Sequence, residues 1–406
     1  MKNNWELLNK LDVATIVAVA PRPGTDFLHS LFDSHPQVLT FDGWLMFHRF
    51  YSSAISVYGT QNQIVDQVGT VLKNSFEKID VTDFYYEFAW GHLHKFNSKY
   101  DTIEKKDKLG INRDEYNSVD IDEFVNHAVN LIGDNNFNSR NALLAVYGAY
   151  ALSRGEDLQT KKILLDHVHL PEHIYPITND FKNMKIIACT RDPRVYATKI
   201  NMYQHFLPLT SMTIGTASAF FRLMLDNIEP LLDLKHVQIK VNILEKLHES
   251  PERTLKDICK WLEIDFDPIL LKSTWNGKSW RGDEHSLKKI KNVFDKNRYY
   301  DAQKSWEKDL STIDQIVVEK LMSAEMSACS YKKKYRSILW YILLPALILI
   351  PTKYELKLLK RIFREGAFSH YLKWVRILLH RYYYSYRKIM IIFLKINKGI
   401  NNYFIN

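Results

Sequence analysis

Residues 13–41 read VATIVAVAPRPGTDFLHSLFDSHPQVLTF, and this stretch decides the expected fold. Segment 14–20 carries no charge, which is typical of a strand buried on both faces of a parallel sheet. A turn rich in proline and glycine follows, and the apolar positions of 26–32 have helical spacing. A strand that leads through a glycine loop into a helix directs main-chain amides and the helix dipole at one point. With Arg22 in this loop, the sequence predicts a phosphate or sulfate site.

The loop lacks the G-x-x-x-x-G-K-[ST] spacing of nucleoside-triphosphate loops. It resembles the 5′-phosphosulfate loop, [KR]-S-G-[ST]-[ST]-x-L, of sulfotransferases that use 3′-phosphoadenosine 5′-phosphosulfate (PAPS), and residues 31–36 resemble the L-L-x-x-H-P of that family. The resemblance implies that six consecutive residues bind the donor: Arg22, Pro23, Gly24, Thr25, Asp26 and Phe27. Pro23 replaces the serine of the family, and Asp26 replaces its second hydroxyl. A carboxylate at this position would repel the donor unless it caps the helix or faces away.

Two histidines end the next predicted strand, residues 162–169 (KILLDHVH). Strand alternation places His167 and His169 on one face at the carboxyl end, where open α/β sheets bind ligands. The segment His169-Leu170-Pro171 resembles the K-T-H-L-P of cytosolic sulfotransferases. This implies that His169 is the general base, a role that suits an imidazole with a pKa of about 6.5, and that His167 is a second catalytic candidate. The residues alone also allow histidines that merely finish a strand, or a metal pair. No third ligand is in view, so no metal is expected.

A second strand-to-helix corner follows the apolar segment 184–190 (MKIIACT). Asp192 suits a helix cap, and Pro193 suits a first helical turn. The continuation resembles the family's 3′-phosphate motif, R-D-P-R-x-V-x-x-S, with one residue deleted after Arg194. The resemblance implies that Arg191 pairs with the 3′-phosphate through its fork of donors and that Thr198 supplies the hydroxyl. Arg194 is expected to be a structural or solvated charge.

Three further segments have expected roles. The aromatic-rich segment 43–58 reads as a core helix, or as a wall on which a sugar could stack. Residues 60–155 read as a helical insert that shapes the acceptor site. Residues 273–283 (STWNGKSWRGD) read as a loop, where the resemblance implies that Arg281 and Gly282 close over the 3′-phosphate. An ordinary surface loop is the alternative.

Composition and charge limit the class of protein. The chain of 406 residues is 46% apolar and 25% charged, as in globular proteins. From residue 331 onward there are 16 of the 55 basic and 2 of the 46 acidic residues, so this tail carries +14 and the remainder −5. Three dispersed cysteines indicate thiols in a reducing compartment, and the first residues do not have the pattern of a signal peptide. A cytoplasmic location is therefore expected.

The tail, residues 331–406, mixes basic with aromatic and aliphatic residues. Its longest apolar run, 338–350, is too short to cross a bilayer, which takes about 20 residues. The pattern favours helices that lie on an anionic membrane surface, at the inner face of the membrane. Helices packed on the body and binding to a polyanion are the alternatives, although a nucleic-acid partner is not expected.

These expectations combine into an α/β fold with a central parallel sheet flanked by helices on both faces, the P-loop-like sulfotransferase fold, and a mostly helical C-terminal extension. Residues 1–330 would form the sulfotransferase domain. The resemblance implies transfer of a sulfuryl group from PAPS to a hydroxyl or amine of a carbohydrate or lipid-linked glycan, leaving 3′-phosphoadenosine 5′-phosphate (PAP). Arg22 would stabilise the developing charge, and no metal would take part. The alternatives are a P-loop-like kinase and a catalytically weakened nucleotide-binding module.

Overall fold

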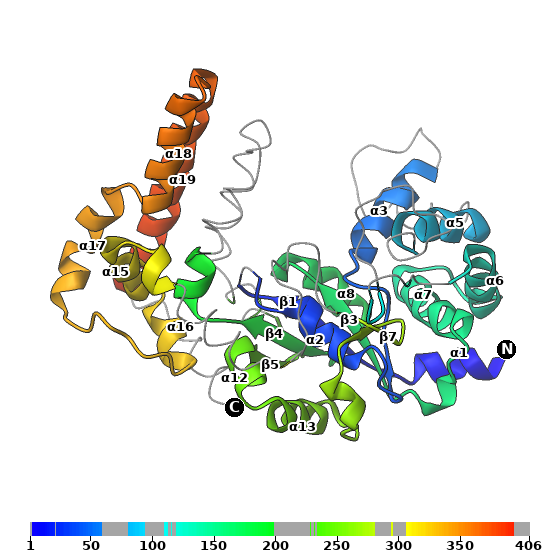
Figure 1. Cartoon of the computed structure of the whole chain (residues 1–406). Coiled ribbons are helices and arrows are strands. Elements are labelled where there is room, and N and C mark those ends of the chain that lie inside the picture. Colours follow the sequence, from blue (N-terminus) through cyan, green and yellow to red (C-terminus); the bar gives the residue numbers. More distant parts are fainter. Residues whose placement is uncertain are drawn as a thin grey trace.

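A parallel sheet of five strands lies at the centre of the computed structural model (Figure 1). The structure describes residues 2–20, 22–58, 80–93, 109–112, 115, 119–198, 228, 231, 234–280, 294 and 306–393. The strand order is β2-β3-β1-β4-β5, and every neighbouring pair is parallel. The strands are β1 (Asp12–Ala18), β2 (Val38–Leu39), β3 (Ile163–Val168), β4 (Lys185–Thr190) and β5 (Gln238–Ile243). The expected fold class is confirmed.

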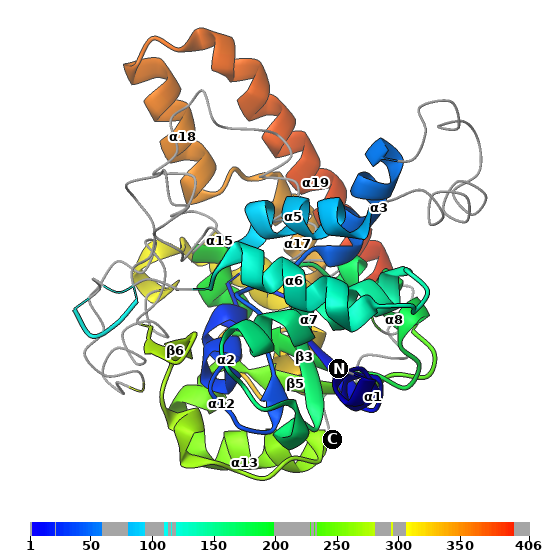
Figure 2. The ribbon, with the colours of Figure 1, turned by 90° about the vertical axis from the view of Figure 1, so that its right-hand side faces the viewer.

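Helices cover both faces of the sheet (Figures 1 and 2). Side chains of β1 alternate between the two layers, with Val13 and Val17 in one and Ala14 and Ile16 in the other. The first layer contains α1 (Lys2–Asn9), α3 (Phe47–Tyr58), α5 (Val81–His92), α6 (Ile121–Ile132), α7 (Ser139–Ser153) and α8 (Ile174–Asp180). The second contains α2 (Thr25–Phe32), α12 (Leu244–Glu249) and α13 (Pro251–Leu262). This double coverage explains why the strands read as continuous apolar runs.

The aromatic-rich segment after β2 has two environments. Phe47 and Tyr51 are buried in the core between α3 and the neighbouring helices, so the core interpretation is confirmed for them. Trp44 precedes α3 and keeps 36% of its surface exposed. Within the expected insert 60–155, helices α5, α6 and α7 belong to the layer that covers the sheet. Its role toward an acceptor stays a prediction.

A short hairpin replaces part of the loop expected at 273–283, so that prediction is wrong for 274–275 and 278–279, which are strands, and holds for the turn between them. β6 (Thr274–Trp275) and β7 (Lys278–Ser279) pair antiparallel. Asn276 and Gly277 join them with φ of 51° and 71°, the two positive angles of a type I′ turn. The Asp33 carboxylate accepts hydrogen bonds from both turn amides, at 3.1 and 2.9 Å. Arg281 and Gly282 lie outside the described residues.

The described part of the C-terminal region includes the helices α15 (Thr312–Leu321), α16 (Ser323–Ala328), α17 (Leu339–Leu349), α18 (Lys353–Arg364) and α19 (Tyr371–Phe393). Leu321, Leu344 and Ile389 belong to one buried cluster, so residues on both sides of position 330 share a core. One of the three alternatives for the tail, packing on the body, is therefore observed for α17 and α19. Helices α18 and α19 project from the sheet as a hairpin (Figure 1). In the part of the chain that the structure describes, no helix has the length and apolar character to cross a bilayer.

Candidate functional site

The predicted site residues meet at the carboxyl ends of three adjacent strands. β1 lies between β3 and β4, with Val17 beside Val168 and Ala18 beside Cys189. The chain continues from β1 to β2 on one side, and later crosses from β3 over to β4 on the other. Open α/β sheets bind ligands at such a switch point, where the connections leave neighbouring strands in opposite directions. The loop after β1, the end of β3 and the residue after β4 therefore lie at the same edge of the sheet.

The loop after β1 has the backbone of an anion site. Gly24 is the N-cap residue of α2 with φ of 83°, and as a glycine it has no side chain that could cap the helix. The first amides of an α-helix have no partner within the helix, so they remain to bind a ligand. A Cβ atom at Gly24 would lie 2.6 Å from Cδ1 of Leu244, so glycine is favoured by both conformation and space. Arg22 also has a positive φ, 51°.

The other loop residues differ in exposure. Pro23 and Thr25 are buried, whereas Arg22 is exposed. The Phe27 ring stacks on His248 with centroids 5.0 Å apart, so only its main chain faces the loop. We define the anion corner as residues 22–27 together with Arg191.

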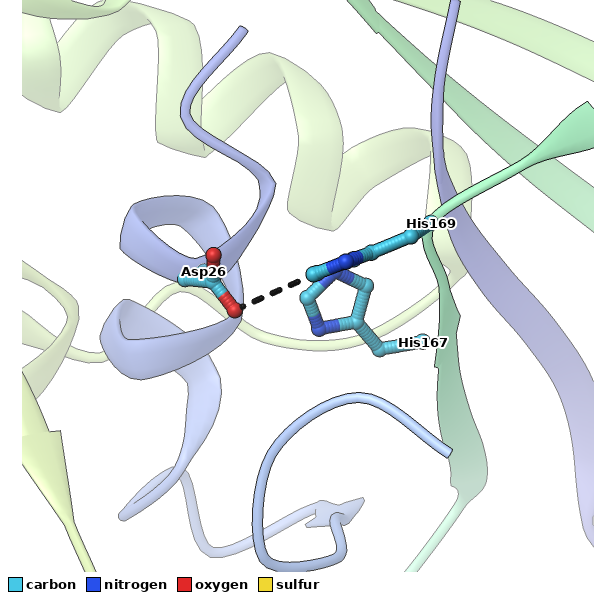
Figure 3. A group of neighbouring side chains, drawn as sticks. All are labelled: Asp26, His167 and His169. Carbon is cyan, nitrogen blue, oxygen red and sulfur yellow. Dashed lines mark ion pairs between the residues drawn. The ribbon is translucent and has the colours of Figure 1, made fainter. Parts of the chain in front are cut away.

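Asp26 does not cap α2 but points at the histidines of β3 (Figure 3). Its Oδ1 lies 3.5 Å from Nε2 of His169. Both side chains are partly exposed, at 38% and 36%, whereas Nε2 of His169 itself is buried. The contact accounts for the carboxylate in the loop, because an imidazole faces it.

His167 is fully buried and contacts a histidine that the sequence analysis missed. Nδ1 of His167 lies 3.1 Å from Nδ1 of His29 in α2. One of these nitrogens must donate and the other accept, so the pair fixes complementary tautomers. The His29 ring packs edge-on against Trp275 of the hairpin, 4.7 Å between centroids. His29 lies four residues after the buried Thr25, so helical spacing alone could have indicated that His29 is on the same buried face of α2.

His169 follows the last residue of β3, and an aromatic ring stacks on its imidazole. Its imidazole stacks on the Trp44 indole with centroids 4.6 Å apart and planes 25° apart. Trp44 is the partly exposed member of the aromatic-rich segment. A flat apolar surface thus lies beside the candidate base.

Arg191 joins the second corner to the first. Its Nη1 donates a 3.0 Å hydrogen bond to the carbonyl oxygen of Arg22. Its Nε is buried and has no hydrogen-bond partner among the described residues. Burial lowers the pKa of Arg191, an effect opposed by the nearby Glu245 carboxylate. A half-buried guanidinium whose buried Nε has no partner among the described residues fits a phosphate or sulfate ligand.

Thr198 and Arg194 have structural contacts. The Thr198 hydroxyl is fully buried and donates to the Val195 carbonyl at 2.7 Å, so it would have to rotate before it could donate to a phosphate. Arg194 pairs with Asp192 at 2.7 Å and with Glu319 of α15 at 2.9 Å. The expected structural role of Arg194 is confirmed, as is the cap at Asp192, whose carboxylate accepts the Arg194 amide.

The described residues contain one group that could hold a metal ion. Asp26, His167 and His169 each offer a ligand atom, and these atoms lie within 4.8 Å of one another. The sequence showed the two histidines but not the carboxylate, because Asp26 reaches them only after α2 packs on the sheet.

No family model and no curated protein matches the sequence. Among solved structures, the chain is similar to the sulfotransferase domain from the curacin biosynthetic pathway, with 13% identity and a TM-score of 0.43 over 79% of this chain and 98% of that domain. It is also similar to the sulfotransferase domain from the Synechococcus PCC 7002 olefin synthase, with 13% identity and a TM-score of 0.39 over 77% and 95%.

Proposed function

We propose that this protein is a sulfotransferase that moves a sulfuryl group from PAPS to a hydroxyl or amine. The observation that carries the proposal is the hydrogen bond from Arg191 to the Arg22 carbonyl. It brings the two segments that resemble donor motifs into one anion corner. Two arginines and a helix N-terminus at one point suit a ligand with two anionic groups.

The residues present fit the donor. The amides at the start of α2 and Arg22 would hold the 5′-phosphosulfate, and the Arg191 fork would hold the 3′-phosphate. PAPS, when bound, supplies the sulfuryl group. Arg22 would stabilise charge that grows on the transferring group. His169 would accept the proton of the acceptor, and the imidazolium so formed would face the Asp26 carboxylate, 3.5 Å away.

A carbohydrate acceptor is supported by Trp44. Its indole is partly exposed and lies against His169, so an acceptor stacked near this ring would present a hydroxyl to the base. The kinase alternative is not favoured, because the loop lacks the G-K-[ST] ending, a lysine followed by a hydroxyl residue, that P-loop kinases use.

A nucleotide-binding module without turnover is the second candidate. Asp26 supports it, because a carboxylate stands where the resembled loop has a second hydroxyl, and it lies 3.5 Å from the candidate base His169. Such a module would bind PAP and show no transfer.

Calorimetry with PAP separates these functions. Wild type should bind one PAP per chain, and Arg191→Ala should weaken binding by about 2–5 kcal/mol, the range for loss of one partner of a buried charge pair. Arg253→Ala, which removes an exposed arginine on α13, is the matched control and should bind as wild type does. Absence of PAP binding in wild type contradicts the donor assignment.

Turnover is then measured with PAPS on a panel of carbohydrate acceptors. The sulfotransferase should release PAP, and His169→Gln should lose the release while it keeps PAP affinity. PAP binding with no release on any acceptor favours the module.

We also infer that the protein acts at an anionic membrane surface. The turn between α18 and α19 exposes Phe363, Phe368 and Leu372, at 54, 63 and 68%. The two phenylalanines contact each other, 5.7 Å between centroids, and exposed Arg364 lies beside them. An exposed apolar tip with Arg361 and Arg364 beside it suits the interface of an anionic bilayer, although both arginines also pair with Glu365.

Vesicle sedimentation tests the membrane inference. The intact protein should sediment with vesicles that contain phosphatidylserine, and Phe363→Ser with Phe368→Ser and Leu372→Ser should abolish this. Met390→Ser, at an exposed site 56% accessible near the other end of α19, is the control. Equal sedimentation of the triple variant and wild type contradicts the inference.

A further inference from the structure

We propose that Asp26, His167 and His169 form a binding site for a divalent transition-metal ion (Figure 3). The three side chains come from two elements, the first turn of α2 and the end of β3. This goes beyond the proposed sulfuryl transfer, which needs no metal, and it does not depend on that function.

The spacing of the ligand atoms supports the site. Oδ1 of Asp26 and Nε2 of His169 are 3.5 Å apart, too long for a strong hydrogen bond. Two ligands of one tetrahedral Zn²⁺, with bonds of about 2.1 Å, are separated by about 3.4 Å. The third atom, on His167, lies within 4.8 Å of the others, so a side-chain movement of about 1 Å would complete the set.

The type of ligand selects the ion. Two imidazoles and one carboxylate suit Zn²⁺ and its neighbours Co²⁺, Ni²⁺ and Fe²⁺, whereas Mg²⁺ and Ca²⁺ prefer oxygen ligands. Three protein ligands leave at least one coordination position for water or another ligand, as in catalytic rather than structural zinc sites.

The surroundings orient the ligands. Nδ1 of His167 contacts Nδ1 of His29, so Nε2 of His167 is the nitrogen that would bind the ion. If the His167 nitrogen donates in this contact, the imidazole is fixed in the tautomer that ligation requires, as outer partners do at known metal sites. The Trp44 indole stacks on His169 and restricts the rotation of that ring.

The site is closed on one side and open on the other. His167 is fully buried, whereas Asp26 and His169 are each more than a third exposed. Nε2 of His169 is itself buried, so an ion that enters past the exposed parts of Asp26 and His169 requires a side-chain movement but no unfolding of the sheet.

Occupancy would have a consequence for the neighbouring corner. An ion bound through Nε2 of His169 occupies the lone pair that would accept a proton, so binding of the ion and base catalysis through this nitrogen exclude each other. The ion would also neutralise the Asp26 carboxylate beside the helix N-terminus. Zn²⁺ should therefore inhibit transfer, if the protein transfers sulfuryl groups, while it leaves PAP affinity equal or higher.

The test is calorimetric titration of ZnCl₂ into the full chain after purification with a chelator, with visible absorption of added Co²⁺ as a second readout. Wild type should bind one Zn²⁺ per chain, and Co²⁺ should give the intense visible bands of a low-coordinate site. His29→Gln removes the residue that contacts the ligand His167 and should weaken Zn²⁺ binding by about 10–100-fold. Asp26→Asn and His169→Gln each remove a direct ligand, so each should weaken Zn²⁺ binding by at least as much.

His127→Gln is the matched control, because His127 forms an exposed pair with Glu123, at 3.6 Å, that has only two potential ligands. It should bind Zn²⁺ as wild type does. Circular dichroism of each variant shows whether it is folded. The proposal is overturned if wild type binds no Zn²⁺, or if folded Asp26→Asn and His169→Gln bind it as tightly as wild type. PAP titration of the same samples reports separately on the proposed function.

Discussion

Nη1 of Arg191 donates a hydrogen bond of 3.0 Å to the carbonyl oxygen of Arg22. The two residues are far apart in sequence, and each follows a neighbouring strand of the sheet. The bond holds the guanidinium over the loop, and the buried Nε is left without a partner among the described residues. The corner is therefore shaped before a ligand arrives, which reduces the cost of ordering on binding.

The geometry of the Arg191 fork leads to the first prediction. Arg191→Lys keeps the positive charge but cannot both bond to the Arg22 carbonyl and present a second parallel donor. We expect the loss of PAP binding free energy in Arg191→Lys to be more than half of the loss in Arg191→Ala. Calorimetry measures both, and a lysine variant that binds as wild type does would show that charge alone suffices.

Gly24 and Gly43 provide a matched pair. Both have a left-handed backbone, with φ of 83° and 84°, but an added Cβ meets Leu244 at Gly24 and nothing within 4 Å at Gly43. Each Gly→Ala change should lower the free energy of unfolding by about 1–2 kcal/mol through backbone strain. Only Gly24→Ala should also weaken PAP binding. Denaturant unfolding and calorimetry measure the two effects, and equal PAP affinity in both variants would contradict the role of the loop.

A buried ion pair fixes the last helix to the body. Nζ of Lys388 lies 2.6 Å from Oε1 of Glu325, and both side chains are at most 5% exposed. Lys388→Met should lower the free energy of unfolding by about 3–5 kcal/mol, because a buried carboxylate is left unpaired. Lys388→Met with Glu325→Leu should recover most of the loss. Denaturant unfolding of the single and double variants tests this, and a double variant less stable than the single one would disagree.

His35 leads to a dependence of stability on pH. Its Nδ1 accepts the Gln37 amide at 3.2 Å, its Nε2 contacts the Asp265 carbonyl at 3.0 Å, and burial lowers its pKa despite Asp267 nearby. The unfolded chain therefore takes up a proton at higher pH than the folded chain. Stability should be full above about pH 6.5 and fall as the pH drops below it. His35→Gln should flatten this slope in unfolding curves recorded between about pH 8 and about pH 5.5.

The three cysteines should be unreactive in the folded protein. Cys189, Cys259 and Cys329 are buried, and burial raises the pKa of each thiol to about 12. The thiolate is the reactive form, so alkylation near neutral pH should be negligible until the chain unfolds. Mass spectrometry after brief iodoacetamide treatment should find no label on native protein and three labels in denaturant. A labelled cysteine in folded protein would contradict its burial.

Much of the fold was predictable because its central strands are buried on both faces. Segments 14–20 and 184–190 read as apolar runs and overlap β1 and β4, and segment 162–169 was predicted as the strand that is β3. The hairpin at 274–279 was missed, although Asn276-Gly277 is the preferred pair for a type I′ turn. Its strands have two residues each, too few for an alternating pattern to appear.

Most residues of the candidate site could be named from the sequence, but the contacts between their side chains could not. The sequence indicated His169, Arg191 and the loop, since each follows a predicted strand. The pairs Asp26–His169 and His29–His167 depend on how α2 packs on β3, which no local pattern encodes. The same limit applies to the tail, where composition favoured amphipathic helices but could not show that Leu344 and Ile389 complete a core with Leu321.

Arg194 has a practical consequence for anyone who shortens the chain. It lies three residues after Arg191, and its guanidinium is buried between Asp192, Glu319 and the Trp306 ring. Deleting the region from residue 306 onward would remove two of those neighbours and expose Val195 and Tyr196, which share a buried cluster with Trp306. The C-terminal helices thus support the segment that follows Arg191, and a shortened chain has to retain them if the anion corner is to keep its structure.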